Sequence, residues 1–306
     1  MKNNNKLKEA KARKNDEFYT RLEDIENEVK HYKTHFKDQV VYCNCDDPEW
    51  SNFFIYFKMN FHHLKLKKLI STHYSTDTES DKAYQLECVE VINKKGTLEE
   101  KKTILKGNGD FRSDECIELL KQSDIVCTNP PFSLFREYVS QLVEYNKKFL
   151  ILGNNNAITY KEVFSLIKEN KLWLGYSANK TMEFQLADDY ERWNRIDEKT
   201  GKKFGKVPAI SWFTNLTHKK RNEKLTLWKQ YSPESFQKYD NFDAINVDAV
   251  SEIPEKYLDF IGVPITFLGK YNPNQFEIIK FRKGNDGKDL SVNGKCPYFR
   301  IIIKAR

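Results

Sequence analysis

A short apolar strand that runs directly into two prolines is the feature of this sequence that most constrains its fold. Residues 124–132 read DIVCTNPPF. Pro130 and Pro131 each fix φ at about −65° and remove a backbone donor, so neither a helix nor a central strand can continue through them. The sequence therefore predicts a strand over residues 124–128 that ends at a rigid turn, with the carbonyls around Asn129 and Pro130 held outward as acceptors.

This strand end has the residue types of a site for a planar group that bears an amine. The side-chain oxygen of Asn129 and the carbonyl of Pro130 can accept both N–H groups of an exocyclic amine and so direct its lone pair toward an electrophile. Phe132 can stack on the ring, a contact worth about 1–3 kcal/mol per base. Two prolines can also serve only to stop a strand before a helix, and the motif by itself leaves that alternative open.

Strands and helices alternate along most of the chain, which predicts an α/β fold with a doubly wound, mostly parallel sheet. A helix is expected over about 21–36, opened by a capping box from Thr20 to Glu23. Loose alternation around a turn predicts an inserted hairpin at about 83–106. Apolar and β-branched runs predict strands at residues 39–45, 66–74, 124–128, 148–152, 172–174 and 209–214.

The sequence changes character near residue 220, which predicts two parts. Residues 1–220 carry the strand and helix alternation, and residues 221–306 are richer in turns, with β-like alternation at 276–281 and 298–304. Within the first part, an insertion of charged and aromatic residues at about 177–208 predicts either a partner-binding segment or a solvated connection.

Composition limits the function classes. The chain of 306 residues is 39% hydrophobic and carries a net charge of +7, which suits a polyanion-binding protein without requiring one. The basic, polar first residues are unlike a secretory signal, and no apolar run approaches a membrane span, so we expect a cytoplasmic protein without membrane contact. Six scattered cysteines lack paired metal-site spacing, which favours reduced core thiols over a metal site.

The motifs resemble the EcoRI-type family of adenine-specific DNA methyltransferases, which are Rossmann-like enzymes that use S-adenosylmethionine. The NPPF element is shared by many amino methyltransferases, whereas CNCDDP and KYNPNQFEI are more specific to this family. The resemblance rests on NDEFYT at 15–20, VVYCNCDDP at 40–48, SNFF at 51–54, GDF at 109–111, TNPPF at 128–132, LGNNNAI at 152–158 and IGVPITFLGKYNPNQFEI at 261–278.

The resemblance implies a role for each motif. The segment Phe18, Tyr19 and Thr20 would fold over the methionine part of the cofactor, and Asp46 and Asp47 would lie beside the cofactor and bind its ammonium or ribose hydroxyls. Asp110 would accept from the amino group of its adenine, and Phe111 would pack on that ring. The catalytic residues would be Asn129, Pro130, Pro131 and Phe132.

The implied activity is methyl transfer to N6 of an adenine flipped out of double-stranded DNA. Residues 1–220 would form the catalytic domain with a DNA-facing insertion at about 177–208, and residues 221–306 would recognise the target. Two alternatives remain: an NPPF-type enzyme acting on RNA or a protein glutamine, and a non-catalytic DNA-binding protein. The resemblance also implies a cognate restriction endonuclease of the same system as a candidate partner.

One departure from the family pattern concerns the cofactor side. Most such methyltransferases place a glycine-rich turn after the first strand, where the backbone approaches the cofactor closely. Residues 43–50 read CNCDDPEW and contain no glycine, and the strand that ends at Ser71, Thr72, His73 and Tyr74 lacks an acidic ligand for the ribose. The cofactor contacts are therefore less clearly encoded than the NPPF element.

Overall fold

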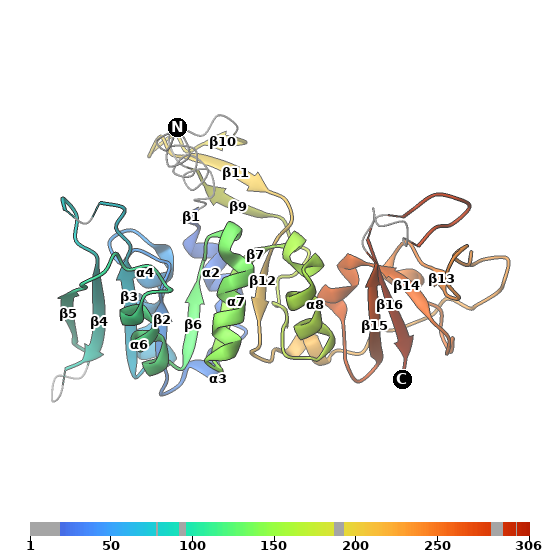
Figure 1. Ribbon diagram of the computed structural model, residues 1–306, viewed down its shortest axis with the longest axis horizontal. Coiled ribbons are helices and arrows are strands. Elements are labelled where there is room, and N and C mark those ends of the chain that lie inside the picture. The colour runs from blue at the N-terminus through green and yellow to red at the C-terminus, as the bar shows by residue number, and fades with distance from the viewer. Residues whose placement is uncertain (1–18, 78, 92–95, 187–192, 283–289, 298) are drawn as a thin grey trace. The chain divides into compact units, whose positions relative to one another are not determined.

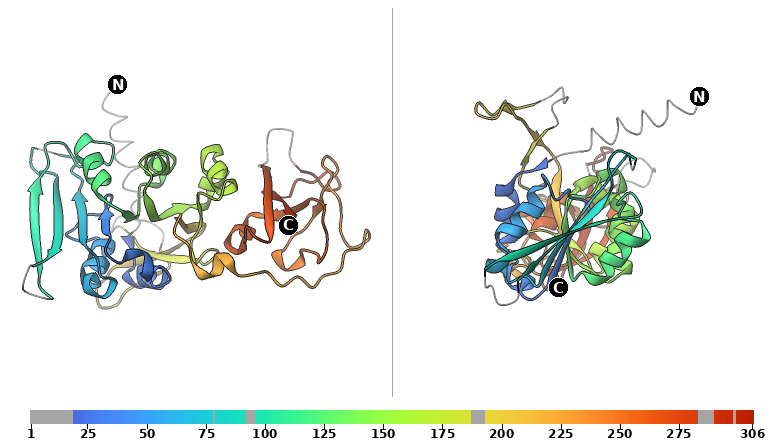
Figure 2. Two further views of the ribbon diagram at one scale, coloured as in Figure 1. Left: turned by 90° about the horizontal axis from the view of Figure 1, so that it is seen from below. Right: turned by 90° about the vertical axis from the view of Figure 1, so that its left-hand side faces the viewer.

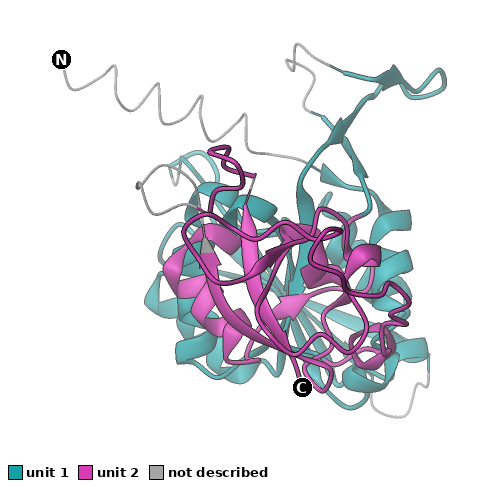
Figure 3. Cartoon of the chain, turned by 90° about the vertical axis from the view of Figure 1, so that its right-hand side faces the viewer, with its two compact units in different colours: residues 1–157, 180–216 teal, residues 158–179, 217–306 magenta. Residues whose placement is uncertain are grey.

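The computed structural model describes residues 19–77, 79–91, 96–186, 193–282, 290–297 and 299–306 (Figure 1). Contacts between Cα atoms divide the chain into two compact units (Figure 3). The first unit comprises residues 1–157 and 180–216, and the second comprises residues 158–179 and 217–306.

A large mixed sheet forms the centre of the first unit. Four neighbouring strands, β3, β2, β6 and β7, are parallel. The hairpin β4–β5 extends the sheet antiparallel beyond β3, and β12 pairs antiparallel with β7. In the order in which they lie, the strands of this unit are β5 (Leu98–Ile104), β4 (Tyr84–Glu90), β3 (Lys68–His73), β2 (Val40–Cys43), β6 (Ile125–Thr128), β7 (Lys148–Asn154) and β12 (Ile210–Thr214).

Helices cover both faces of the sheet (Figure 2). Helix α4 packs on β3, whereas α6 packs on β2 and α7 on β7. Helix α7, which follows the NPPF element, buries an apolar stripe of Phe135, Tyr138, Val139 and Leu142. The helices of this unit are α2 (Leu22–Val29), α3 (Lys33–Phe36), α4 (Asn52–Met59), α5 (Phe61–Leu64), α6 (Asp114–Gln122) and α7 (Phe135–Glu144). The fold is mixed α/β around a large mixed sheet.

The single helix expected over residues 21–36 is wrong, because α2 ends at Val29 and α3 begins at Lys33. Arg21, not Thr20, is the N-cap residue of α2, and it makes no side-chain capping bond. Tyr32, just before α3, and Phe36, the last residue of α3, are both fully buried. The spacing of apolar residues reflects which positions are buried, and it continues across the break between α2 and α3. No glycine or proline marks this break, so the sequence did not reveal it.

A second, smaller sheet of this unit forms where the sequence predicts an insertion. Strand β1 pairs antiparallel with β9, β9 with β11, and β11 with β10. Its strands are β1 (Tyr19–Thr20), β9 (Met182–Gln185), β11 (Lys203–Val207) and β10 (Arg195–Ile196). The described residues of the insertion are therefore largely a β-ribbon, which the polar, aromatic sequence did not suggest.

The second unit contains helix α8, strand β8 and a four-stranded sheet. Helix α8 packs on β15, with the rings of Phe164 and Phe281 5.2 Å apart. The elements are α8 (Lys161–Lys168) and β8 (Trp173–Leu174), followed by the sheet strands β13 (Ile245–Asn246), β14 (Ile261–Pro264), β16 (Arg300–Ala305) and β15 (Phe276–Arg282). Across the described parts of both units, no helix has the length and apolar character needed to span a bilayer.

Candidate active site

The site lies at the carboxyl edge of the parallel strands. Strands β2, β3 and β6 end at Cys43, His73 and Thr128, and because they are parallel the segments that follow them gather at one edge of the sheet. Strand β3 lies on one side of β2 and β6 on the other, so the chain changes direction across the sheet at this point. Ligands of open α/β sheets bind in the crevice at such a switch point. A cavity of about 300 Å³ is found here.

The cavity brings together nearly all the residues singled out in the sequence. Phe132 does not line it; this residue is half-buried and begins the short 3-10 helix Phe132–Leu134. Phe18 lies outside the described residues. The expected residues that line the cavity are Tyr19, Thr20, Asp46, Asp47, Asp110, Phe111, Asn129, Pro130 and Pro131.

Other residues of the cavity wall were not expected. Most of them follow β2 and β3 or flank the expected motifs, so their position just beyond a strand end was the signal that could have found them. They are Asn44, Cys45, Trp50, Ser51, Asn52, Phe53, Thr72, Tyr74, Gly109, Arg112, Ser133 and Leu134.

Asp46 connects the loop after β2 to the NPPF loop. One carboxylate oxygen accepts a hydrogen bond from the hydroxyl of Ser51 at 2.7 Å, and Ser51 caps helix α4. The other oxygen accepts from the hydroxyl of Thr128 and from the backbone N–H of Asn129 at 3.3 Å. Thr128 Oγ1 also accepts from the backbone N–H of Cys45 at 3.2 Å. The position of Asn129 is thus fixed by the acidic loop.

Burial raises the pKa of Asp46 from 3.8 to about 6, even though the hydrogen bonds from Thr128, Ser51 and the Asn129 backbone favour the carboxylate. The neighbouring charge of Asp47 acts in the same direction as burial. A buried carboxylate is costly to ionise without a cation nearby. The environment of Asp46 therefore favours a positively charged ligand.

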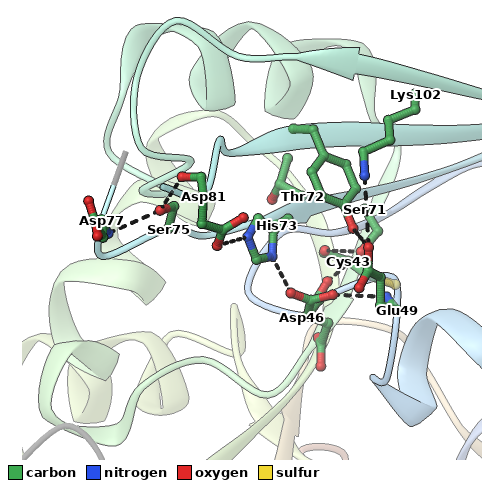
Figure 4. Close-up of polar contacts among 12 residues, drawn as sticks. Cys43, Asp46, Glu49, Ser71, Thr72, His73, Ser75, Asp77, Asp81 and Lys102 are labelled. Carbon is green, nitrogen blue, oxygen red and sulfur yellow. Dashed lines mark hydrogen bonds and ion pairs between the residues drawn. The ribbon is translucent and has the colours of Figure 1, made fainter. Parts of the chain in front are cut away.

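Asp47 is held from the end of β3 by His73. Nδ1 of His73 bonds to Oδ2 of Asp47, and Nε2 lies 2.7 Å from Oδ2 of Asp81 (Figure 4). The other oxygen of Asp47 accepts the backbone N–H of Glu49 at 2.8 Å. Burial disfavours the charged form of His73, but its hydrogen bonds to the two carboxylates outweigh that effect and raise its pKa. His73 thus joins Asp47 to the end of β3.

Aromatic rings support His73. The ring of Tyr84 stacks on it with centroids 4.9 Å apart, and Trp50 approaches edge-on at 6.3 Å. Tyr84 is itself fixed, because its hydroxyl donates to Glu49 at 2.8 Å and Nζ of Lys102 lies 3.5 Å from its ring centre. Strand β4 of the hairpin supplies Tyr84, so the inserted hairpin supports the acidic side of the cavity.

Asp110 and Phe111 form another part of the wall. Nε and Nη2 of Arg112 donate to the two oxygens of Asp110 at 2.8 and 2.6 Å, and the backbone N–H of Arg112 donates to Oδ1 at 2.9 Å, which orients the carboxylate. The Asp110 hydrogen bonds raise the pKa of Arg112, so the guanidinium stays charged. Phe111 is buried edge-on against Tyr138 with centroids 5.0 Å apart. An aromatic face and a fixed carboxylate therefore lie side by side.

Comparison with known proteins identifies the family of the chain. The family described as "Adenine-specific methyltransferase EcoRI" matches residues 6–306. The Type II methyltransferase M.EcoRI of Escherichia coli is 51% identical over 98% of this chain and 96% of its own. The chain belongs to the EcoRI family of adenine-specific methyltransferases.

Two mycoplasma relatives of this EcoRI-family chain extend the comparison. The Type II methyltransferase M.MgeORF184P of Mycoplasma genitalium is 42% identical over 96% of this chain and 97% of its own. The Type II methyltransferase M.MpnI of Mycoplasma pneumoniae is 42% identical over 97% of both chains. No solved structure matches the chain.

A glycine lets two segments of the cavity wall approach each other closely in this EcoRI-family chain. Gly109 is the one glycine among the cavity-lining residues, and its φ is +78°. A Cβ at this position would lie 2.4 Å from the carbonyl oxygen of His73. The glycine therefore lets the Asp110 segment pack directly against the end of β3.

Two buried polar atoms in the wall of this EcoRI-family cavity remain without a hydrogen-bond partner in the described part of the chain. They are Oγ1 of Thr20 and Nδ2 of Asn44. The backbone of Thr20 is fixed, because its carbonyl accepts from Nδ2 of Asn52 at 2.7 Å. An unsatisfied buried polar group costs about 1–3 kcal/mol, so the cavity wall is suited to a polar ligand.

Proposed function

We propose that this chain transfers a methyl group from S-adenosylmethionine to N6 of an adenine that has been flipped out of duplex DNA. The observation that carries the proposal is the cavity itself. The acidic segment after β2 and the Asn129–Pro130–Pro131 segment after β6 line the same space, and Asp46 joins them through a hydrogen bond to the Asn129 backbone. Donor and acceptor sites of a methyl transfer would need to meet in this way.

The cavity residues fit the cofactor. The cavity volume of about 300 Å³ lies at the lower end of the range for small-molecule sites. Asp46 and Asp47 supply negative charge for the ammonium, the sulfonium or the ribose hydroxyls. Asp110, oriented by Arg112, can accept from the amino group of the cofactor's adenine, while Phe111 packs on that ring. Tyr19 and Thr20 close the methionine side.

The NPPF segment would hold the acceptor amine. Asn129 Oδ1 and the carbonyl of Pro130 accept the two N–H groups of the adenine N6, so the nitrogen lone pair points into the cavity. Phe132, the residue after Pro131, is half-buried and can stack on the flipped base. When bound, S-adenosylmethionine supplies an electrophilic methyl group. The residues contribute alignment and the two hydrogen bonds, and the extra proton leaves to water.

The remaining architecture supports this assignment. Helices on both faces and the switch point at β2 suit a Rossmann-like, doubly wound catalytic domain, formed mainly by residues 1–220 with a DNA-facing insertion at about 177–208. Residues 221–306 would recognise the target sequence. The relatives are named Type II methyltransferases, so we expect this enzyme to modify DNA in the cytoplasm, with a companion restriction endonuclease as a candidate partner.

Transfer of tritiated methyl groups tests the proposal. Purified protein would be incubated with labelled S-adenosylmethionine and, separately, with duplex DNA, RNA and a glutamine-containing peptide, and the methylated product would be identified. Labelled N6-methyl-2′-deoxyadenosine from DNA alone is the expected result. Label in RNA or peptide alone would assign the same cavity to another substrate, and cofactor binding without transfer to any of them would contradict the enzymatic proposal.

A further inference from the structure

The hairpin of residues 193–207, called here the basic hairpin, lies outside the cavity and has no role in the chemistry above. It contains β10, the turn of residues 197–202 and β11, with Arg195 opposite Phe204 and Ile196 opposite Lys203. Its sequence carries five cationic and two acidic residues. The cations are Arg195, Lys199, Lys202, Lys203 and Lys206.

The turn of the basic hairpin is fixed by its own hydrogen bonds. Oδ1 of Asp197 accepts the backbone N–H groups of Lys199 and Thr200 at 3.1 and 2.9 Å and the hydroxyl of Thr200 at 2.9 Å. These bonds, led by that of the Thr200 backbone, lower the pKa of Asp197 and keep it ionised. Gly201 takes the positive φ of +69° that closes the turn. A preformed turn loses little entropy when it binds a partner.

The turn carries two lysines, Lys199 and Lys202, beside two carboxylates, Asp197 and Glu198. Lys199 and Lys202 are exposed, and neither makes an ion pair within the described parts of the chain. Arg195 differs, because it donates to Glu183 at 2.9 Å. Glu183 also accepts a hydrogen bond from Arg21 at 3.1 Å. This bond connects β9, the strand that pairs with the hairpin, to the segment that follows β1. Arg195 is thus paired with a carboxylate of β9, whereas Lys199 and Lys202 of the turn make no ion pair among the described residues.

Apolar and aromatic side chains lie between these cations. Trp193 and Ile196 are 45% and 48% exposed. Nζ of Lys203 lies 4.4 Å from the ring centre of Trp193, and the guanidinium of Arg195 lies 4.1 Å from that of Phe204. These contacts stiffen both strands while leaving one face of Trp193 accessible. The hairpin combines a positive charge with an accessible apolar surface.

The base of the hairpin is bonded to the cavity wall. Strand β11 pairs with β9, and β9 pairs with β1, whose Tyr19 and Thr20 line the cavity. Duplex DNA held by the hairpin would therefore be placed in register with the site where its base is modified. A two-stranded ribbon also fits the major groove, which is about 12 Å wide.

We propose that the basic hairpin enters the major groove of the substrate duplex, with Lys199 and Lys202 on backbone phosphates and Trp193 and Ile196 against base edges. This inference rests on the proposed function and names the element that holds the DNA. A polyanion is the partner that the charge of the hairpin fits, since residues 193–207 carry five cations against two carboxylates, and Lys199 and Lys202 make no ion pair among the described residues. The ribbon shape selects a groove over a flat surface.

The salt dependence of DNA binding tests the phosphate contacts. Each lost phosphate contact lowers the slope of log K against log salt by about 0.9, so the double variant Lys199→Gln, Lys202→Gln is expected to lower it by about 1.8. The control is Lys65→Gln, Lys67→Gln, because both lysines are exposed beside the amino end of β3, at the edge opposite the cavity. A slope that falls equally in both double variants, or in neither, would overturn the inference.

Chemical footprinting tests the groove, once the target site has been read from modified DNA. Dimethyl sulfate modifies guanine N7 in the major groove and adenine N3 in the minor groove. The parental protein should protect N7 near the target, and Trp193→Ala, Ile196→Ala should lose that protection. Protection restricted to adenine N3, or N7 protection that survives in the variant, would contradict major-groove entry.

These experiments distinguish failure of the hairpin proposal from failure of the proposed function. If the parental protein transfers no methyl group to DNA, the proposed function fails whatever the hairpin does. If it methylates DNA and the hairpin variants bind with an unchanged salt slope, only the inference about the hairpin fails. Affinity for S-adenosylmethionine and the melting temperature should stay at parental values in the lysine variants, because the altered side chains are exposed and outside the cavity.

Discussion

Asp46 gives the sharpest prediction about the cofactor side, because its ionisation and the binding of a cation are linked. Its pKa of about 6 means that roughly nine tenths of the molecules carry a neutral Asp46 at pH 5 and about one tenth at pH 7. If the positive charges of S-adenosylmethionine bind beside the carboxylate, only the ionised form binds well. Affinity should therefore weaken as pH falls.

The magnitude follows from the same value. Between pH 7 and pH 5 the dissociation constant should rise about tenfold, equivalent to about 1.4 kcal/mol. A variant without the Asp46 carboxyl separates this effect from the titration of His73, whose pKa is raised by its hydrogen bonds to Asp47 and Asp81. Binding at pH 5 should release close to one proton, and binding at pH 7 should release almost none.

Titration calorimetry with S-adenosylmethionine between pH 5 and 7, in two buffers of different ionisation enthalpy, measures both the affinity and the protons released. Asp46→Asn is the matched variant, because it keeps the size of the side chain and removes its titration. We expect the variant to bind more weakly at pH 7 and with an affinity that hardly changes with pH. A parental affinity that is flat over this range, or a tenfold change that persists in Asp46→Asn, would refute the linkage.

Three further predictions address other parts of the site. Asn129→Ala should lower turnover about 10²- to 10³-fold while leaving cofactor affinity near the parental value, because Asn129 holds the amine and not the cofactor; calorimetry and single-turnover kinetics separate the two effects. Phe132→Ala should weaken capture of the flipped base by about 1–3 kcal/mol, seen as a smaller fluorescence increase from a 2-aminopurine target, and an unchanged signal would remove its stacking role. Gly109→Ala should lower the melting temperature more than Gly201→Ala: both residues have positive φ, but a Cβ at Gly109 meets the His73 carbonyl at 2.4 Å, whereas one at Gly201 meets nothing within 4 Å.

Local sequence signals located the strand ends of the catalytic unit. Apolar, β-branched runs predicted β2, β3, β6 and β7 to within a few residues, because these strands are buried and burial leaves a composition signal. The prolines after β6 marked the turn that carries Asn129. The carboxyl ends of neighbouring parallel strands lie at one edge of a sheet. The sequence could therefore predict that Asp46, Asp47 and Asn129 lie around one cavity.

Features set by distant contacts were less predictable. The hydrogen bond of Asp46 to the Asn129 backbone joins residues 83 positions apart, and no local pattern encodes it. The sequence shows no acidic residue at the end of β3. The histidine at that position, His73, instead bonds to Asp47. Strands β9, β10 and β11 form a ribbon rather than a buried sheet, so they carry polar and charged residues. An alternation of apolar and polar residues therefore did not mark them as strands.

The central claim is that the segment from Asn129 to Phe132 presents an adenine amine of duplex DNA for methylation. It is tested most directly by measuring N6-methyladenine in DNA from cells that express the parental protein or Asn129→Ala. The account predicts N6-methyladenine at one short recurring sequence with the parental protein and nearly complete loss with the variant. DNA without N6-methyladenine in the parental cells, or equal modification by Asn129→Ala, would contradict it.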